Sequence, residues 1–401
     1  MTSMPEERVL FLYAAPDGGH KECADSVRKT FKYYYSSAMH TEGRDTITCL
    51  YPVLGSFVAK MYLEILRYTP QIWNFLYDNR NIEEITREFR ELFSLLNASK
   101  LDSMFREYRP TAFVCTHALP CEIMANLKRR GKCNIPLIGI VTDYAVHSYW
   151  VHHEIDLYIV ANHKARETLV ARGIPIHKIK VCGIPTDPAF NLRLPRKDAR
   201  KRLSLDEKKP VVLIMGGARG IGPITEITQR ILYLKHAPQL IIVTGTNKEL
   251  WKDLRPYHKL KNVHIYGYTR LIPIMMDAAD ILVTKPGGIT SSEALIKKLP
   301  MILVNPIPGQ EARNARYLIK HGAAIRAKEV WKLGETVKNL LSHPERLKKI
   351  SEKAGNIATP NASRECCKEI LNTLNSLKIK NEYIFSKFSS QSDNVSVLTQ
   401  T

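Results

Sequence analysis

The chain has 401 residues, of which 44% are hydrophobic and 24% are charged. This composition is typical of a globular protein and excludes a fibrous or low-complexity chain, and the length predicts two domains rather than one core. The formal net charge of +20 favours polyanionic partners, such as nucleotide phosphates, anionic lipid or nucleic acid. No apolar run reaches the ~18 residues that a membrane-spanning helix needs.

The start of the chain and the cysteines indicate the compartment. Acidic residues precede a short apolar run without a cleavage pattern, so we expect a strand there and no signal peptide. The eight cysteines form no CxxC pair. Their spacing favours buried free thiols in a reducing compartment over a disulfide framework or a zinc site. We therefore expect a cytoplasmic protein without a metal site.

Short apolar runs alternate with helical patterns along the whole chain. In the first half the predicted strands are Val9–Ala15, Thr46–Pro52, Ala112–His117, Leu137–Asp143, Leu157–Asn162 and Ile179–Gly183. In the second half they are Val211–Met215, Leu240–Gly245, Val263–Tyr266, Ile281–Thr284 and Met301–Asn305. Apolar strands separated by helices predict an α/β protein with parallel sheets covered on both faces.

A charged stretch, 191–209, separates the two series of strands and is interpreted as a basic linker. We expect one doubly wound domain over 1–190 and a second over 210–379. Residues 380–401 are polar and rich in serine, which predicts a disordered tail. Because ligands of open α/β sheets bind beyond the carboxyl ends of the strands, two such domains facing each other would form a cleft.

The first predicted strand ends in Gly18-Gly19-His20, directly before an amphipathic helix. Glycines allow a tight turn and a close approach to a ligand. The positive end of the helix dipole would lower the pKa of His20 and keep its imidazole neutral, as a general base requires. The pattern fits equally a turn histidine that only caps the helix or is solvated.

A second glycine-rich turn, 216–222, follows strand Val211–Met215. Its backbone amides can hold phosphate oxygens at a helix N-terminus. It lacks the Gly-Lys-Ser/Thr of a P-loop and fits GxGxxG poorly, so an ordinary turn at the end of a strand is the alternative.

The third turn, "KPGGITSSEAL", follows strand Ile281–Thr284 and predicts a helix that begins near Thr290. Thr290 and Glu293 fit a capping box, which would leave Glu293 a purely structural role. Alternatively, Glu293 binds ribose hydroxyls, while Gln310 and Glu311 at the next strand end bind sugar hydroxyls. The helix N-terminus and basic side chains would hold the phosphate charge without a metal.

These motifs give the chain a resemblance to a known family. The segments "VTDYAVHSYW", "VCGIPTDPAF", "LIMGGARGIG", "GYTRLIPIMMDAADILVTKPGG" and "NPIPGQEARNA" occur in the order found in the monogalactosyldiacylglycerol synthase and processive diacylglycerol glucosyltransferase group. That group belongs with the MurG-like glycosyltransferases of family 28. The resemblance covers about residues 9–330. It implies a GT-B fold, in which two Rossmann-like doubly wound domains face each other across a cleft.

The resemblance also implies a role for each matching residue. The catalytic residues would be His20, as the base, and Asp143. Acceptor-side residues would be Gly18, Gly19, His147 and Trp150. Donor-binding residues would be Gly217, Arg219, Tyr268, Lys285, Gly287, Gly288, Thr290, Glu293, Gln310 and Glu311. One departure is Asp17, which stands where the family shows the first glycine of Gly-x-Gly-His.

The implied activity is an inverting transfer of a hexose from a UDP-sugar to diacylglycerol or a glycosyldiacylglycerol. Glucose is expected as the hexose rather than galactose. The lipid acceptor and the basic charge suggest peripheral binding to an anionic membrane surface, with segment 56–79 either in the headgroup layer or buried as an ordinary helix. The alternatives are a MurG-like transferase to another lipid-linked acceptor and a UDP-sugar epimerase. A nucleic-acid binder is disfavoured because no such motif is present.

Overall fold

The computed structural model describes residues 7–14, 17–35, 39–50, 105, 107–304, 306, 309–327 and 329–395, with the backbone alone beyond 378. Its strands form two parallel six-stranded sheets, one in each half of the chain. The first contains, in spatial order, β2 (Met39–Asp45), β1 (Glu7–Tyr13), β3 (Ala112–Cys115), β4 (Leu137–Ile140), β5 (Leu157–Val160) and β6 (Ile179–Val181). The second contains β12 (Ala324–Arg326), β11 (Met301–Leu303), β10 (Ile281–Thr284), β7 (Val211–Met215), β8 (Gln239–Val243) and β9 (Val263–Tyr266).

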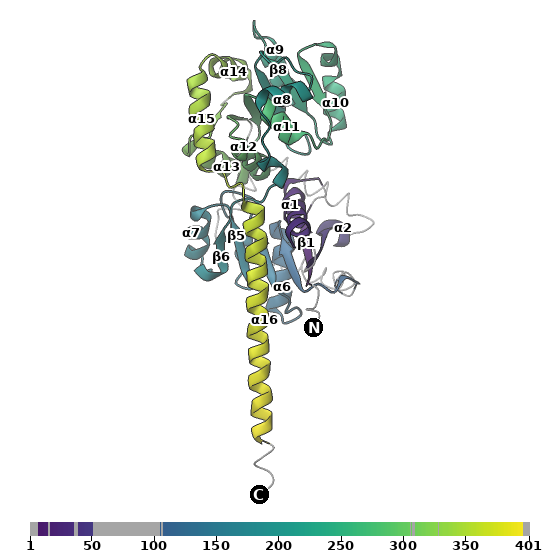
Figure 1. Cartoon of the computed structure of the whole chain (residues 1–401), viewed down its shortest axis with the longest axis vertical. Helices are drawn as coiled ribbons and strands as arrows, with labels where there is room; N and C mark the ends of the chain where they lie inside the picture. Colours follow the sequence, from purple (N-terminus) through teal and green to yellow (C-terminus); the bar gives the residue numbers. More distant parts are fainter. Residues whose placement is uncertain are drawn as a thin grey trace.

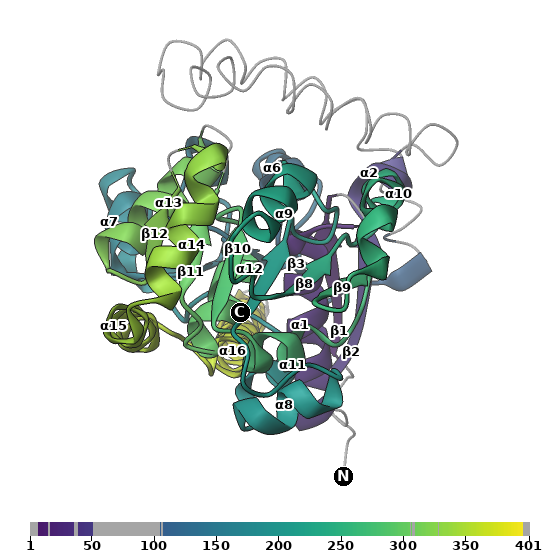
Figure 2. The same ribbon diagram turned by 90° about the horizontal axis from the view of Figure 1, so that it is seen from above.

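Helices cover both sheets (Figures 1 and 2). Those after the first strands are α1 (Gly19–Tyr34), α2 (Thr46–Leu50), α6 (Ala118–Arg129) and α7 (His163–Ala171). The second half adds α8 (Arg196–Arg202), α9 (Ile224–Leu232), α10 (Lys248–Leu254), α11 (Ile272–Ala278), α12 (Gly288–Ile296), α13 (Gln310–Lys320), α14 (Leu333–Leu341), α15 (Pro344–Asn356) and α16 (Ala362–Val395). The arrangement confirms the predicted GT-B architecture.

Both faces of each central strand are buried. Leu10 and Phe11 are neighbours in β1, so their side chains point to opposite faces, and both are 0% exposed. They belong to two different apolar clusters, one on each side of the sheet. This double burial explains why the central strands appear in the sequence as continuous apolar runs.

The prediction of a strand over Thr46–Pro52 is wrong. Helix α2 occupies Thr46–Leu50, and the edge strand beside β1 is β2, immediately before α2. β2 lies at the edge of the sheet, and its polar sequence MHTEGRD carries no apolar run. The sequence analysis also missed β12, an edge strand of three residues.

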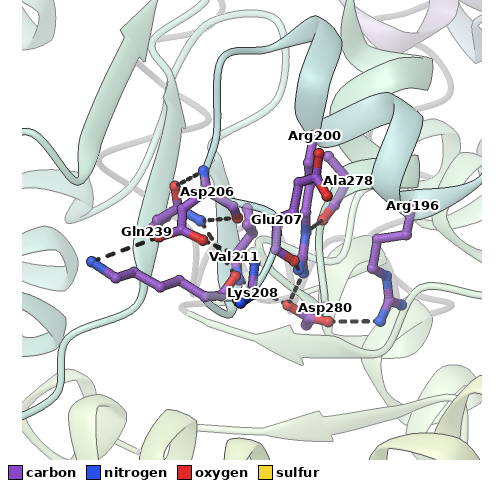
Figure 3. A network of polar contacts seen from close by, with 10 residues as sticks. Arg196, Arg200, Asp206, Glu207, Lys208, Val211, Gln239, Ala278 and Asp280 are labelled. Atoms are coloured by element: carbon purple, nitrogen blue, oxygen red, sulfur yellow. Dashed lines mark hydrogen bonds and ion pairs between the residues drawn. The ribbon is translucent and has the colours of Figure 1, made fainter.

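The predicted linker, 191–209, contains helix α8, which packs against α11 of the second domain. Arg200 anchors it from a nearly buried position (Figure 3): its guanidinium binds Asp280 Oδ2 at 2.7 Å and donates to the carbonyl oxygens of Ala278 and Glu207. Asp280 also accepts a hydrogen bond from the amide of Val211, the first residue of β7. The stretch therefore belongs to the second domain rather than to a free linker.

The chain returns to the first domain at its end. Helix α16 packs along α1 and β5, with Cys366, Cys367 and Ile370 fully buried, and the Cys367 thiol donates to the carbonyl oxygen of Val27. Figure 1 shows α16 running beside the first domain and beyond it. The predicted second-domain boundary at 379 thus falls inside a helix that packs on the first domain, and the tail predicted to be irregular from 380 is helical to Val395.

All eight cysteines are free thiols, as predicted, and six are buried. Among the helices that the structure describes, none combines the length and the hydropathy that crossing a bilayer requires. Segment 56–79, with its two alternative interpretations, lies outside the described residues.

Candidate active site between the two domains

His20 is the second residue of α1, and its imidazole lies against residues at the ends of two neighbouring strands. Nδ1 is 2.8 Å from the carbonyl oxygen of Thr116 and 3.0 Å from Oγ1 of Thr142. A carbonyl oxygen only accepts hydrogen bonds, so Nδ1 carries the proton and Nε2 keeps its lone pair. The ring of His117 packs edge-on against His20 at 4.5 Å between centroids. This tautomer leaves Nε2 as the atom that can accept a proton.

The electrostatic surroundings keep this imidazole neutral. The pKa of His20 is lowered to about 4, mainly by burial and in addition by the positive charges of Arg219 and Lys285, while the hydrogen bond to Thr116 acts in the opposite direction. The predicted direction of the pKa shift is confirmed, with burial as its main cause rather than the helix dipole. Arg219 and Lys285 belong to the second domain, so their effect shows that predicted donor-side cations lie near His20.

The predicted acceptor turn and donor turn meet across the two domains. A Cβ atom added at Gly19 would lie 3.0 Å from Cγ1 of Ile289, which belongs to the first turn of α12. Arg219 Nε donates to the carbonyl oxygen of Asp17 at 2.9 Å. This contact uses the backbone of Asp17, so a side chain at the family's first glycine position does not disturb it.

Helix α12 begins at Gly288, with Gly287 as its N-cap, two residues before the predicted start. Thr290 is therefore the third residue of the helix and cannot act as its N-cap. The capping-box interpretation of Thr290 and Glu293 is wrong, and the N-terminus of α12 has no side-chain cap. Its first amides remain available to an anion, as a diphosphate turn requires.

Glu293 lies half-buried on α12, close to acidic residues of the first half of the chain. Burial raises the pKa of Glu293 well above its ordinary value, and the negative charges of Glu22 and Asp187 raise it further. Tyr268 donates from its hydroxyl to Oε1 of Glu22 at 3.1 Å, which brings a further predicted donor residue to this junction. Carboxyl groups in this setting suit a ligand that offers hydroxyl hydrogens.

The remaining donor residues lie at neighbouring strand ends of the second sheet. Lys285 follows β10, and its Nζ binds Oε1 of Glu311 at 2.7 Å. A Cβ atom at Gly217, whose φ is +71°, would lie 3.4 Å from Cε of Lys285, so the turn after β7 reaches the same place. Gln310 is the first residue of α13, directly before Glu311. The structure thus brings the predicted phosphate-binding turns and sugar-binding side chains together.

Three predicted residues of the first domain, Asp143, His147 and Trp150, are buried and do not form an open surface for an acceptor. Asp143 is buried and accepts a hydrogen bond of 2.7 Å from Asn314 of α13, and burial raises its pKa to about 6. Trp150 is 1% exposed and packs in the core of the first domain, near Gly139 of β4. His147 is 3% exposed and lies beside Trp150, with 6.3 Å between ring centroids.

The sequence analysis missed the residues that support His20 and Asp143, namely Thr116, His117, Thr142 and Asn314. The signal was available for three of them, because Thr116, His117 and Thr142 lie at strand ends on the same rim as His20. Asn314 belongs to the segment "GQEARNA", but nothing in the sequence indicates that its partner lies in the other domain.

Comparison with known families identifies both halves of the chain. Residues 20–186 match the family described as monogalactosyldiacylglycerol (MGDG) synthase. Residues 211–365 match the family described as glycosyltransferase family 28 C-terminal domain. The two matches follow each other in the chain. The first covers the first sheet apart from β1, and the second covers the whole second sheet.

Two similar proteins carry the name processive diacylglycerol beta-glucosyltransferase. The one from Staphylococcus saprophyticus is 29% identical over 371 residues, which are 92% of this chain and 93% of that protein. The one from Bacillus cereus is 27% identical over 363 residues, 88% of this chain and 90% of that protein.

Solved structures agree with the fold. MurG from Acinetobacter baumannii superposes with a TM-score of 0.58 at 15% identity, covering 91% of this chain and 99% of that one. HepE from Anabaena, in complex with UDP-glucose, gives a TM-score of 0.56 at 15% identity, with 91% and 99% covered. With both halves matched and their junction formed by the predicted residues, the chain is a glycosyltransferase that combines a segment matching the monogalactosyldiacylglycerol synthase family with one matching the glycosyltransferase family 28 C-terminal domain.

Proposed function

We propose that this glycosyltransferase moves a hexose, glucose in preference to galactose, from a UDP-sugar to the hydroxyl group of diacylglycerol or a glycosyldiacylglycerol. The names of its relatives support the lipid acceptor and the sugar. The UDP and UDP-glucose complexes of HepE support the donor. We place the reaction at the cytoplasmic surface of the membrane, to which the chain would bind peripherally.

The observation that carries the proposal is the placement of His20 at the junction with the donor-side turns. Its Nδ1 donates a hydrogen bond to the carbonyl oxygen of Thr116, its pKa is lowered to about 4, and Arg219 and Lys285 of the second domain lie nearby. A neutral imidazole that faces a donor site is what a base for an acceptor hydroxyl requires.

The reaction then follows as one displacement. The acceptor oxygen attacks the anomeric carbon while the bond from that carbon to the UDP oxygen breaks, and the bonding electron pair leaves with UDP. His20 Nε2 receives the hydroxyl proton. Attack from the face opposite UDP converts an α-linked donor into a β-glycoside. A positioned base contributes typically about 10²–10⁴-fold, and alignment across the cleft supplies a further part of the rate.

The leaving diphosphate needs positive partners. We assign this role to Lys285, Arg219 and the free amides at the start of α12, which together stabilise the charge without a metal. Glu293 would bind the ribose hydroxyls, and Gln310 and Glu311 the hydroxyls of the sugar. Lys285 now pairs with Glu311, so donor phosphate would compete with that carboxylate for the ammonium group.

The test is a product analysis with the full chain. Vesicles that contain diacylglycerol are incubated with each UDP-hexose, and the lipids are examined by mass spectrometry and by NMR of the anomeric proton. We expect β-glucosyldiacylglycerol, followed by diglucosyl products, from UDP-glucose. Absence of glycolipid with every UDP-hexose would overturn the proposal. Conversion of UDP-GlcNAc without any lipid would instead identify the epimerase, a fold neighbour at a TM-score of 0.57.

A further inference from the structure

Residues 142–144, directly after β4, form a dense set of contacts with the second domain. We propose that this segment is the coupling contact that aligns the base histidine with the donor-binding turns, and that Asp143 is a positioning residue rather than a proton acceptor. The inference deepens the proposed function and rests on it.

Thr142 contacts the acceptor side and the donor side at once. Its Oγ1 lies 3.0 Å from Nδ1 of His20. Its carbonyl oxygen lies so close to Gly288, the first residue of α12, that a Cβ atom added there would be 1.9 Å away. Glycine at 288 is thus required by the approach of the other domain, independently of any phosphate. One residue therefore sets the distance between the imidazole and the start of α12.

Asp143 is held by an asparagine that makes three hydrogen bonds from a buried position. Asn314 is 0% exposed, and its Nδ2 donates to Oδ1 of Asp143 at 2.7 Å and to the carbonyl oxygen of Pro286 at 3.1 Å. Its Oδ1 accepts from the amide of Tyr144 at 2.9 Å. Both hydrogens of the carboxamide and its oxygen have partners, so its orientation is fixed. It ties the first domain to the turn that carries Lys285.

Tyr144 extends this contact into the second domain. Its hydroxyl lies 2.8 Å from Oγ of Ser292 on α12, and its ring stacks on Tyr317 of α13 with centroids 4.6 Å apart and an angle of 10°. Its carbonyl oxygen accepts from Nδ2 of Asn162, which anchors the segment in its own domain. The segment therefore contacts both α12 and α13.

This geometry connects the parts that the reaction must align. Asn314 follows Gln310 and Glu311 by one turn of α13, so the helix that carries the predicted sugar-binding residues is fixed to Asp143. Asp143 uses its carboxylate on Asn314, whereas His20 is contacted by Thr142. Misplacement by about 1 Å can cost about 10²-fold in rate, so a contact of this kind acts through alignment.

Four variants of the full chain test the inference through the atoms involved. Asp143→Asn keeps an oxygen that accepts from Asn314, so we expect kcat within about threefold of the parent. Asp143→Ala removes the acceptor. Asn314→Asp replaces the donating amide group by an oxygen atom, which would face the acceptor oxygens of Asp143 and Pro286. Each variant should lower kcat at least tenfold. The double variant Asp143→Asn/Asn314→Asp restores a donor opposite an acceptor and should regain at least fivefold over Asn314→Asp. UDP affinity, measured by calorimetry, should change less than threefold throughout.

Two kinetic results would overturn the inference. One is Asp143→Asn as slow as Asp143→Ala, which would indicate a proton-transfer role; the other is a double variant no faster than Asn314→Asp.

A second measurement does not depend on turnover. The distance distribution between spin labels on exposed sites of the two domains should broaden in Asp143→Ala, Asn314→Asp and Gly288→Ala. It should stay narrow in Gly287→Ala, because a Cβ atom at 287 meets nothing within 4 Å. If the parent makes no glycolipid, the proposed function fails, while unchanged distributions in the first three variants would refute the coupling contact itself.

Discussion

A single hydrogen bond decides what His20 can do. Because Nδ1 donates to Thr116, only Nε2 is left to take a proton. We expect His20→Gln to lower kcat by about 10²–10⁴-fold, since glutamine cannot accept and hold that proton, and to leave the Kd for UDP within about twofold. Steady-state kinetics and calorimetry measure the two quantities. The matched control is His177→Gln on an exposed turn, which should match the parent in both. Full turnover in His20→Gln would remove His20 from the reaction.

The lowered pKa of His20 sets the acid side of the pH profile. With a pKa of about 4 in the fold, the imidazole stays neutral from pH 8 to well below 6.5, so kcat/KM should remain nearly constant over that range. An ordinary histidine would lose half of its base form near pH 6.5. The same shift makes the fold lose stability as pH falls from about 6.5 toward 4, because the unfolded state binds the proton more readily. An acid limb with an apparent pKa at or above 6.5 would contradict this assignment.

At the scale of elements, helix α8 depends on one buried charge pair (Figure 3). Replacing Arg200 by alanine leaves Asp280 partly buried without its main partner, so we expect a loss of about 3–5 kcal/mol from the stability of the second domain. Arg196→Ala is the matched control, because Arg196 binds the same carboxylate from a side chain that is 55% exposed and should cost less than about 1 kcal/mol. Urea unfolding, followed by the fluorescence of Trp251 and Trp331, measures both. Equal midpoints for the two variants would show that burial does not matter here.

The elements that the sequence predicted best are the ones buried on both faces. Strands β7 and β10 begin and end at the predicted residues, because these central parallel strands are fully buried and almost entirely apolar. The edge strand β9, in which buried and half-buried residues alternate, was also predicted with its correct bounds. Two edge strands were missed: β2, because its sequence MHTEGRD is polar, and β12, because it has only three residues. The start of α12 was misplaced because Thr290 and Glu293 imitate a capping box inside the helix.

The candidate site was predictable as a set of strand ends but not as a set of contacts. Glycine turns and polar side chains after buried strands identified His20, Lys285 and Glu311 from sequence, and the structure brings them together. The partner of Asp143 was not predictable, because Asn314 lies 171 residues away and on the other domain. Pairings of this kind follow from the relative placement of two domains, which no local pattern encodes.

At the scale of the whole molecule, the chain crosses from the first domain to the second and then back again, and this double crossing limits how the domains can separate. Helix α16 leaves the second domain and packs on α1, while the stretch before α8 makes the first crossing, so two strands of backbone join the domains. Ser363, at the start of α16, donates to the carbonyl oxygen of Thr186, which ties the two crossings to each other at 2.7 Å. The contacts of residues 142–144 with α12 and α13 join the same two domains at a third place, beside His20 and Gly288.

The net charge of +20 is also a property of the whole molecule, and it leads to a prediction about membranes. Each basic residue near an anionic surface contributes about 1 kcal/mol, and this attraction extends over a Debye length of about 10 Å at 0.1 M salt. We expect the chain to sediment with vesicles that contain anionic lipid and to dissociate from them as NaCl rises from ~0.05 to ~0.5 M. It should not sediment with zwitterionic vesicles at either salt concentration. Binding that is unchanged by salt would show that apolar insertion, rather than charge, holds the protein at its lipid substrate.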